Sequence, residues 1–412
     1  MTGTGRHAVV IGGSLGGLTT ALLLTEAGYS VSVHERAVEL ADRGAGIVAH
    51  PESLRYLVER GIATVDDLSI PCGNLRYIDG AGVLVHAAPV GYRFTSWVAL
   101  HSRLIAQLPA GSMHFGSTLI DFHDRGDAVA VRLQGDVEES CDLLVCADGI
   151  SSTARRVLVP AAAPAYSGYI GWRGTVSLDT VEASVRASLG NHITYQLLDA
   201  GHVLAYPIPG PGGGDGPGAS LNWIWYRQRP AGRALMQAMT DRWGREHALS
   251  VPPGWVDSGV VIGLRHAASE LLATDLAALV LSTPGPFIQK VVDVEVDQMA
   301  FGRVCLVGDA AFAARPHAAA GTAKAAADAW ALGAQLSGAD DVPTGLRRWQ
   351  PDQLDLGRSL VHRSRALGDS QFGGEWIPGD TSLLFGLRVA GDSCFDVSDA
   401  TASLDRGAVA GR

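Results

Sequence analysis

The chain has 412 residues, of which 47% are hydrophobic and 18% are charged, so it can fill a sizeable core and is not a disordered protein. Its length predicts two closely packed domains or one large one. The net charge is −10 and no long basic run is present, which argues against a nucleic-acid partner.

Targeting signals and cysteine usage both favour a cytoplasmic protein. The N-terminal segment has no cationic region followed by a cleavable apolar core, and no apolar stretch reaches the ~18 residues that a membrane span needs. The cysteines are odd in number and have no repeated spacing, which indicates a reducing compartment rather than a disulfide scaffold. They are Cys72, Cys141, Cys146, Cys305 and Cys394.

Cys141 and Cys146 could form a redox pair, but the residues between them are expected to form a buried strand. Residues five apart on a strand point to opposite faces. We therefore expect the cysteines to be structural. We also expect no membrane association and no metal site.

The first 35 residues predict a strand, a glycine turn, a helix and a second strand. Ala8 to Ile11 are all apolar, as in a strand that is covered on both faces. The turn occupies residues 12–17, and apolar residues then recur at helical spacing up to Gly28, where a helix would end. Residues 29–35 alternate as a second strand does. Such a unit predicts a parallel sheet and an α/β fold.

A second, mostly antiparallel sheet is expected between about residues 165 and 290. Short runs of β-forming residues lie at 169–176, 193–198, 203–207 and 221–226. They alternate with turns rather than with helices. A glycine-rich loop at 209–218 is expected to be mobile.

After Phe301 the chain returns to the α/β pattern. A buried strand is expected at 304–308, followed by an alanine-rich helix that runs to about residue 336. Apolar residues between 345 and 370 follow a helical pattern. Pro351 is expected to interrupt this helix, because proline lacks the backbone N–H that a helix interior needs.

The turn after the first strand is typical of a dinucleotide-binding site. Gly12 permits the tight turn, the helix N-terminus can face a pyrophosphate, and Gly17 lets helix and strand pack closely. Ser14 replaces the second glycine of the G-x-G-x-x-G pattern, but its small side chain can itself donate a hydrogen bond to a phosphate. Glu35 lies 23 positions after Gly12, near the ~20 expected for an acid that binds a ribose hydroxyl. A plain glycine turn is the alternative.

Two further motifs place an aspartate at the end of an apolar strand, where ligand crevices open in such sheets. The segment CADGISSTAR at 146–155 follows the strand at 143–145, and GDAAFAARPHAAAGT at 308–322 precedes the alanine-rich helix. Asp309 could accept from a cofactor hydroxyl, and the backbone N–H groups of 320–322 could face an electron-rich ring edge. For Asp148 and Asp309 alike, a helix N-cap is the alternative.

These three motifs, in this order, resemble the GxGxxG, DG and GD motifs of single-component FAD-dependent aromatic hydroxylases with the p-hydroxybenzoate-hydroxylase-like fold. The resemblance covers almost the whole chain. Longer strings narrow it to the 2,6-dihydroxypyridine 3-hydroxylase branch. They are YIGWRG at 169–174, NWIWYR at 222–227, PFIQ at 286–289 and RPHAAAGTAK at 315–324.

The resemblance implies a Rossmann-like FAD-binding domain interleaved with a mostly antiparallel β-sheet substrate domain and followed by a C-terminal helical segment. The expected FAD-binding parts are residues 1–165, with short β insertions near 71–100, and 291–340. The substrate domain is expected at 166–290, and the helical segment and tail at 341–412.

The resemblance also implies an NAD(P)H-dependent monooxygenase. FAD would be tightly bound, O2 would add at the flavin C4a to give a hydroperoxide, and one oxygen would pass to an electron-rich, hydroxypyridine- or phenol-like ring. Only one dinucleotide fingerprint is present, so NADH or NADPH would dock transiently.

Carried over by motif position, most of the expected site residues bind FAD. The glycine turn and the acid at the end of the second strand would hold the ADP half of FAD. Arg103 would bind the pyrophosphate or the ribityl chain. The two aspartate motifs would bind the remaining parts of FAD. The expected FAD-binding residues are Gly12, Gly13, Ser14, Leu15, Gly17, Glu35, Arg36, Arg103, Asp148, Gly149, Gly308, Asp309, Ala320, Gly321 and Thr322. The chain departs from the family at Phe312, where a histidine is usual, and at Ala323, where an asparagine is usual.

Substrate contacts are expected on the second sheet. His317 and His50 are the histidines best placed to take a phenolic proton, and Arg173 could hold a substrate oxyanion. Each has a structural alternative: the histidines could be satisfied by backbone carbonyls, and the arginine could be an ordinary sheet residue. The tryptophans of these strands are expected in the core. They are Trp172, Trp223 and Trp225.

Several alternatives stay open from the sequence. A flavin halogenase is disfavoured, because Tyr226 and Arg227 follow the W-x-W string where that class has an Ile-Pro pair. An FAD-dependent oxidoreductase or epoxidase-type enzyme acting on a polyketide-like metabolite, and a non-catalytic FAD- or NAD-binding sensor, remain. A homodimer is expected from the family alone. The substrate and the choice between NADH and NADPH are not set by these motifs.

Overall fold

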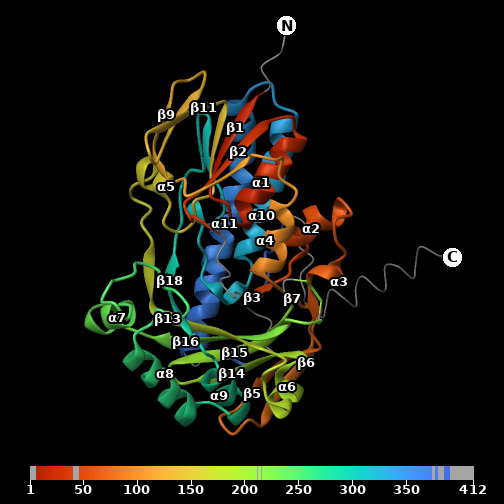
Figure 1. Ribbon diagram of the computed structural model, residues 1–412, viewed down its shortest axis with the longest axis vertical. Helices are drawn as coiled ribbons and strands as arrows, with labels where there is room; N and C mark the ends of the chain where they lie inside the picture. Colours follow the sequence, from red (N-terminus) through yellow and green to blue (C-terminus); the bar gives the residue numbers. More distant parts are fainter. Residues whose placement is uncertain are drawn as a thin grey trace, which may run out of the picture.

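The computed structural model describes residues 6–39, 46–210, 212–214, 216–373, 376–378 and 385–389. Within them, two sheets lie one above the other along the long axis of the molecule, and each is accompanied by its own helices (Figure 1). Cys394 and two residues of the glycine-rich loop, Pro211 and Asp215, lie outside the described residues. The expected α/β architecture with a C-terminal helix is confirmed.

The first sheet is mainly parallel and has the order β19-β20-β12-β1-β2-β8. Only β19 and β20 pair in antiparallel fashion among these described strands. The strands are β1 (His7–Ile11), β2 (Ser30–Glu35), β8 (Met113–Phe115), β12 (Leu143–Cys146), β19 (Ala300–Phe301) and β20 (Val304–Leu306). The predicted strand-helix-strand unit is therefore confirmed, with α1 (Leu15–Glu26) between β1 and β2.

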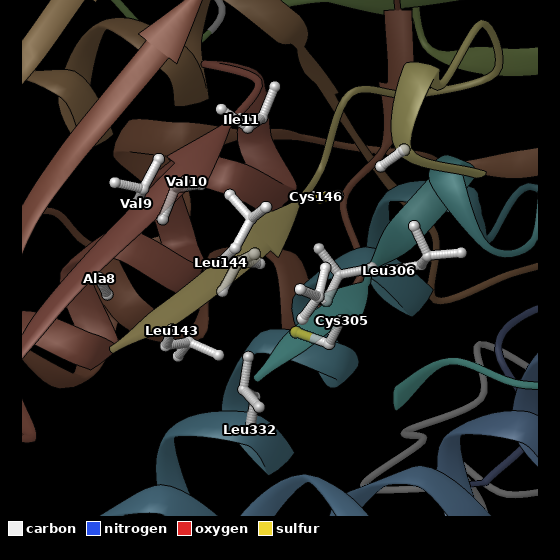
Figure 2. Packing of buried hydrophobic residues seen from close by; sticks show 14 of the residues in the cluster. Ala8, Val9, Val10, Ile11, Leu143, Leu144, Cys146, Cys305, Leu306 and Leu332 are labelled. Atoms are coloured by element: carbon white, nitrogen blue, oxygen red, sulfur yellow. The ribbon is translucent and has the colours of Figure 1, made fainter. Parts of the chain in front are cut away.

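The apolar runs of β1, β12 and β20 form the centre of the first core (Figure 2). Ala8, Val9 and Val10 have no exposed surface, because both faces of the sheet are covered. Helix α10 (Gly321–Ser337) packs along α1, and a side chain at Gly333 would press on Leu23 at 3.2 Å. The small residues of α10 thus let the two helices approach each other closely.

The second sheet has the order β17-β18-β13-β16-β15-β14-β5-β6. Neighbouring strands are antiparallel except for β14 and β5, which are parallel. The strands are β5 (Asn74–Ile78), β6 (Leu84–Pro89), β13 (Ala165–Ser177), β14 (His192–Leu198), β15 (Gly201–Ile208), β16 (Ser220–Gln228), β17 (Ser250–Val251) and β18 (Phe287–Asp293). The insertion expected near 71–100 therefore supplies two strands to this sheet.

The two faces of the second sheet have different roles. Trp172, Trp223 and Trp225 are at most 1% exposed and pack on the outer face against helices, which confirms that they are core residues. Tyr206 and Tyr226 lie on the opposite face, which packs toward α10 and α11 (Val342–Gly373). The helices of the outer layer are α6 (Ala183–Leu189), α7 (Arg233–Ala238), α8 (Ser258–Leu271) and α9 (Thr274–Leu281) (Figure 1). The sequence reading expected only strands and turns there.

Two small sheets and the remaining helices complete the described structure. One sheet contains β9 (Leu119–Asp124), β10 (Val129–Leu133) and β11 (Val137–Cys141); the other contains β3 (Gly46–Val48), β4 (Ile70–Pro71) and β7 (Arg93–Ser96). The helices are α2 (Pro51–Glu59), α3 (Val65–Leu68), α4 (Trp97–Ile105), α5 (Thr153–Leu158) and α11 (Val342–Gly373), with short 3-10 turns at Gly308–Ala310 and Pro316–Ala318.

The expected interruption at Pro351 is wrong, because α11 continues through it. Tertiary contacts hold the helix on the N-terminal side of the proline. The Trp349 indole donates to the Asp328 carbonyl at 3.0 Å, and the Gln350 side chain accepts from the N–H groups of Met299 and Ala300. These contacts offset the hydrogen bond that a proline removes.

The four described cysteines are buried and unpaired. Cys141 ends β11 and Cys146 ends β12, so the two thiols belong to different strands. Burial raises the pKa of all four thiols, which disfavours the reactive thiolate.

The described residues contain neither a membrane-spanning helix nor a metal-binding cluster. Within the described ranges, no helix is both long and apolar enough to cross a membrane. Nor does this part of the chain bring three His, Cys, Asp or Glu side chains into a metal-binding group.

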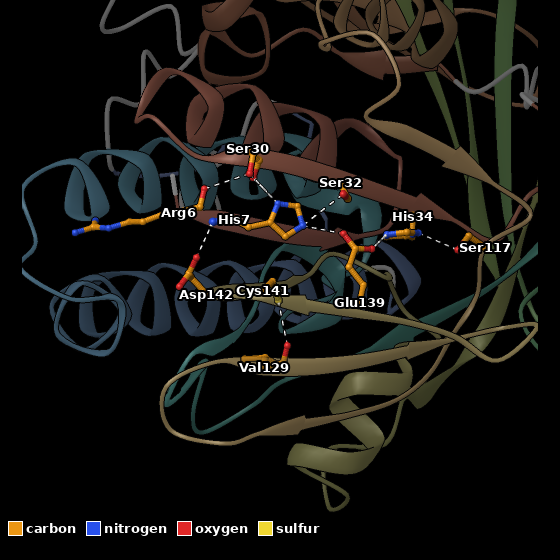
Figure 3. Close-up of polar contacts among 10 residues, drawn as sticks. All are labelled: Arg6, His7, Ser30, Ser32, His34, Ser117, Val129, Glu139, Cys141 and Asp142. Carbon is orange, nitrogen blue, oxygen red and sulfur yellow. Dashed lines mark hydrogen bonds and ion pairs between the residues drawn. The ribbon is translucent and has the colours of Figure 1, made fainter. Parts of the chain in front are cut away.

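Glu139 on β11 joins two histidines of the first sheet, His7 on β1 and His34 on β2 (Figure 3). His7 donates to one carboxylate oxygen and His34 to the other, each at 2.8 Å. The hydrogen bond to Glu139 raises the pKa of His7 above 6.5. Burial raises the pKa of Glu139, but the hydrogen bonds from His34 and His7 outweigh it and hold that pKa below 4.5.

We predict that Glu139→Gln destabilises the protein most between pH 4.5 and 6.5. The His7 contribution is complete below 6.5 and is lost as the pH rises through its folded pKa. The Glu139 contribution is complete above 4.5 and is lost at lower pH. The loss should be about 1 kcal/mol, as for a partly exposed pair.

Denaturant unfolding at pH 5.5 and 8.5 measures this effect. Glu138→Gln, at an exposed position on the same strand, is the control. An equal loss at both pH values for Glu139→Gln would contradict the ionic part of the explanation.

Candidate active site

The glycine turn brings β1, β12 and α1 into direct contact. Gly12 has a φ of +109°, and a side chain there would clash with the Ala147 carbonyl at the end of β12. A side chain at Gly17 would clash with the Gly12 carbonyl. Helix α1 has no side-chain cap and no acidic residue in its first turn. Its first N–H groups are therefore available to an anion such as a pyrophosphate.

Glu35 lies beside this turn, as its spacing predicts. One carboxylate oxygen accepts from Gly13 N and the other from Ala37 N, both at 2.9 Å. Each oxygen keeps a second lone pair for another donor, such as a ribose hydroxyl. Arg36 is exposed at the end of β2.

Helix α4 supports the turn from the other side. His101 donates to the Gly13 carbonyl at 2.7 Å, and the Trp97 indole donates to the Ser14 hydroxyl oxygen at 3.1 Å. The Ser14 proton is therefore still available for a phosphate. Sequence reasoning missed Trp97 and His101, because their role depends on where α4 docks. The one signal that could have found them is their closeness in sequence to Arg103.

Arg103 is directed at the glycine-rich loop in this structure. Its guanidinium donates to the carbonyls of Ala99 and Gly212 at 2.9 Å, and it lies 3.5 Å from that of Asp67. It thereby connects α4 with the loop that leaves β15. Its expected contact with the FAD pyrophosphate stays a prediction.

Asp148 uses one carboxylate oxygen to cap a helix and leaves the other without a partner among the described residues. One carboxylate oxygen accepts from Thr153 N at 2.7 Å, which is the helix-capping alternative. The other oxygen, Oδ1, is buried and has no hydrogen-bond partner in the described part of the chain. Gly149 follows it in the turn. A buried acceptor without a donor is unusual in a folded protein, so Asp148 fits a bound donor group.

Arg155 connects the second and third motifs. Its side chain is 1% exposed and donates to the carbonyl of Ala310 at 2.9 Å and to that of Asp309 at 3.4 Å. It also donates to two carbonyls near it in sequence, that of Ala162 at 3.0 Å and that of Ile150. Arg155 ends the second motif, but its role was missed because the carbonyls that it binds lie on a distant segment.

Asp309 lines a recess next to this arginine. Its side chain is accessible to solvent, and its carboxylate has no hydrogen bond within the described residues. Surrounding protein nevertheless desolvates it and raises its pKa to about 6, against the opposing charges of Lys324 and Arg155. Solvent therefore reaches the Asp309 carboxylate although protein atoms surround it, which indicates that it lies in a concave part of the surface. Gly308, just before it, donates to Asp328 on α10 at 2.8 Å.

The start of α10, like that of α1, has no side-chain cap. Ala320, at the N-cap, provides no side-chain hydrogen bond, and Gly321 and Thr322 begin the helix. Ala319 just before it has a φ of +55°. His50 donates to the Ala319 carbonyl at 2.8 Å and is 2% exposed. His50 thus holds the peptide that leads into α10.

A small cavity of about 20 Å³, with room for about one water molecule, lies between this turn and the second sheet. Its lining residues are Val48, His50, Tyr92, Ile193, Tyr195, Ala319, Phe385 and Gly386. The pocket therefore joins the turn before α10 to the aromatic inner face of the sheet.

His317 is buried between the sheet and α11. Its Nε2 lies 2.6 Å from the Tyr169 hydroxyl, and a side chain at Gly368 of α11 would lie 2.8 Å from its ring. Burial, aided by the charges of His202 and Arg315, lowers its pKa well below 6.5, so the ring is neutral. This environment favours the structural alternative over that of a substrate base.

Together these residues fit FAD. Two uncapped helix N-termini, those of α1 and α10, offer N–H groups to a pyrophosphate and to an electron-rich ring edge. The unpartnered oxygen of Asp148 and the recessed carboxylate of Asp309 offer acceptors to hydroxyl groups between them. No side chain in the first turn of α1 competes with an anion.

Comparisons with known proteins agree with this fit. A family described as FAD binding domain-like matches residues 166–293, and one described as FAD binding domain matches residues 288–360. The 2,6-dihydroxypyridine 3-monooxygenase of Paenarthrobacter nicotinovorans is 35% identical over 392 residues, which cover 94% of this chain and 97% of that protein. Salicylate hydroxylase of Pseudomonas putida is 28% identical, covering 83% and 79% respectively.

The solved structure of 2,6-dihydroxypyridine-3-hydroxylase from Arthrobacter nicotinovorans has the same fold. It matches with a TM-score of 0.89 at 33% sequence identity. The match covers 94% of this chain and 98% of that one.

We predict that Arg155→Lys lowers the free energy of unfolding by about 3 kcal/mol and weakens FAD binding, because several buried carbonyls lose their donor. Denaturant unfolding and FAD titration of the apoprotein measure the two effects. Arg156→Lys, at the exposed neighbouring position, is the control. Unchanged stability and FAD affinity in Arg155→Lys would show that Arg155 does not hold the two motifs together.

Proposed function

We propose that this chain, which belongs to the FAD-dependent aromatic monooxygenases, oxidises NADH or NADPH and hydroxylates a hydroxypyridine- or phenol-like ring with O2. The observation that carries the proposal is that three segments far apart in sequence converge on one recess. They present the N-terminus of α1, the free oxygen of Asp148, the carboxylate of Asp309 and the N-terminus of α10.

FAD would supply the redox chemistry, taking a hydride from the nicotinamide and activating O2. The N–H groups at the start of α1 would bind its pyrophosphate, and Glu35 would accept from the adenosine ribose. Asp148 and Asp309 would accept from the hydroxyl groups of the ribityl chain. With the long axis of FAD fixed in this way, its ring would lie at the start of α10.

The start of α10 would stabilise negative charge on the ring edge. Gly321 and Thr322 present N–H groups and the positive end of the helix dipole there. His50 would keep these groups in place through the Ala319 carbonyl. We therefore assign His50 a positioning role, in which it orients the peptide rather than taking a proton from the substrate.

The substrate would lie between this ring edge and the second sheet. The inner face of the sheet is rich in tyrosine, and the pocket beside Tyr195 and Ala319 is mainly apolar. Such a wall excludes water and favours a small planar ring. Only one nucleotide-binding turn was found in the sequence, so NADH or NADPH would bind transiently.

The decisive experiment measures coupling. The FAD-loaded enzyme is mixed with NADH or NADPH and a panel that includes 2,6-dihydroxypyridine and salicylate. We expect one ring to accelerate nucleotide oxidation at least tenfold, with one hydroxylated product formed per nucleotide oxidised. Nucleotide oxidation that yields only hydrogen peroxide for every ring would contradict hydroxylation of this substrate class.

We predict that Asp309→Ala weakens FAD binding about tenfold to a hundredfold, because the recess loses its acceptor. FAD content after purification and titration of the apoprotein measure the loss. Asp297→Ala, at an exposed carboxylate between β18 and β19, is the control. Stoichiometric FAD in purified Asp309→Ala would contradict the assignment of Asp309 to the ribityl chain.

A further inference from the structure

Asn222 carries a buried hydrogen-bond donor that has no partner among the described residues. The residue lies on β16 and is 1% exposed. Its Oδ1 accepts from Gly46 N at 3.1 Å, which fixes the orientation of the amide. The Nδ2 group on the other side is buried and has no partner within the described ranges. Buried amides of this kind are nearly always paired.

Arg173 carries a second such donor on the neighbouring strand. Its Nε is buried and has no hydrogen-bond partner in the described chain. Burial raises the pKa of the Tyr226 and Tyr206 hydroxyls, and the guanidinium charge opposes that shift in both. The positive charge of Arg173 therefore acts inside the aromatic inner face of the sheet.

The two donors lie on the same face of the sheet. Arg173 on β13 pairs with Ile224 on β16, and Asn222 lies two residues before Ile224. Residues two apart on a strand share a face, and diagonal neighbours of this kind are about 7–8 Å apart. That separation is within reach of long polar side chains, so the two donors can meet at one acceptor between them.

This face is the one turned toward the FAD-binding half. Tyr206, which pairs with Asn222, stacks on Phe94 with ring centroids 4.3 Å apart. Gly46, the backbone partner of Asn222, begins β3, and Val48 at the end of β3 lines the pocket. The donors thus lie on the same face of the sheet as Ile193 and Tyr195, which line the pocket, although neither donor lines it.

We propose that Arg173 and Asn222 together bind the ionised oxygen of the aromatic substrate. The inference rests on the proposed function and adds that the substrate binds as an anion, through an oxygen on the ring edge that faces the sheet. A guanidinium selects negative charge, and an amide N–H selects an oxygen acceptor. Holding the hydroxyl group as its anion also makes the ring a better nucleophile toward an electrophilic oxygen.

Ligand binding to the FAD-loaded protein, without NADH or NADPH, tests this inference. The change in the flavin absorbance spectrum reports the Kd. The probes are 2,6-dihydroxypyridine, whose anion is an ionised ring hydroxyl, and benzoate, whose anion is a carboxylate. The neutral ring of similar shape is 2,6-dimethoxypyridine.

Two variants remove the donors separately. Arg173→Gln removes the charge, and Asn222→Asp removes the amide donor while keeping the acceptor that Gly46 needs. We expect each variant to weaken binding of the dihydroxy ring about tenfold or more. Binding of the dimethoxy ring should change less than twofold.

The matched control is Thr194→Val. Thr194 on β14 is also 1% exposed, and its hydroxyl also lacks a partner in the described chain. It lies on the outer face of the second sheet, whereas Arg173 and Asn222 lie on the inner face. It should leave all Kd values unchanged. FAD content and thermal unfolding identify any variant that fails to fold.

The outcomes separate this inference from the proposed function. If the wild-type protein binds the dimethoxy ring as tightly as the dihydroxy ring, or if both variants bind the dihydroxy ring normally, the inference is wrong although hydroxylation can stand. Tighter binding of benzoate than of the dihydroxy ring would identify a carboxylate site and overturn the ring-oxyanion assignment. If no ring alters the flavin spectrum or stimulates nucleotide oxidation, the inference and the proposed substrate class both fail.

Discussion

The guanidinium of Arg155 determines where the two aspartate motifs stand relative to each other. It is buried, and its donors reach carbonyls on both sides of the site, including those of Ala162 and Ala310. A planar cation with several N–H donors in fixed directions sets both the distance and the angle between the groups that it joins. The spacing between the Asp148 and Asp309 carboxylates, and so the fit to one cofactor, depends on this contact.

Features that depend on local chemistry could be predicted from the sequence. The apolar run before Gly12, the helical spacing after it and the position of Glu35 each express a rule that acts over a few residues. The same is true of Asp148 and Asp309, because an aspartate after a buried strand must lie at the edge of a sheet. The structure places each of these residues at the expected edge.

Features that depend on the docking of distant segments could not be predicted. The roles of Trp97 and His101 follow from the position of α4, which no local pattern encodes. Pro351 lies inside a helix because contacts made by Trp349 and Gln350 outweigh the local preference of proline. His317 looked like a base by its place in a motif, yet its buried contact with Tyr169 depends on the packing of α11.

The parallel pairing of β5 with β14 has a consequence for folding during synthesis on the ribosome. Asn74 meets His192, so the early hairpin of β5 and β6 is made more than a hundred residues before its sheet partner exists. Val83 directly precedes β6 and Val85 lies on it, and both side chains are exposed. A nascent chain that pauses before β14 emerges therefore exposes the unpaired edge of β5, which favours misassociation.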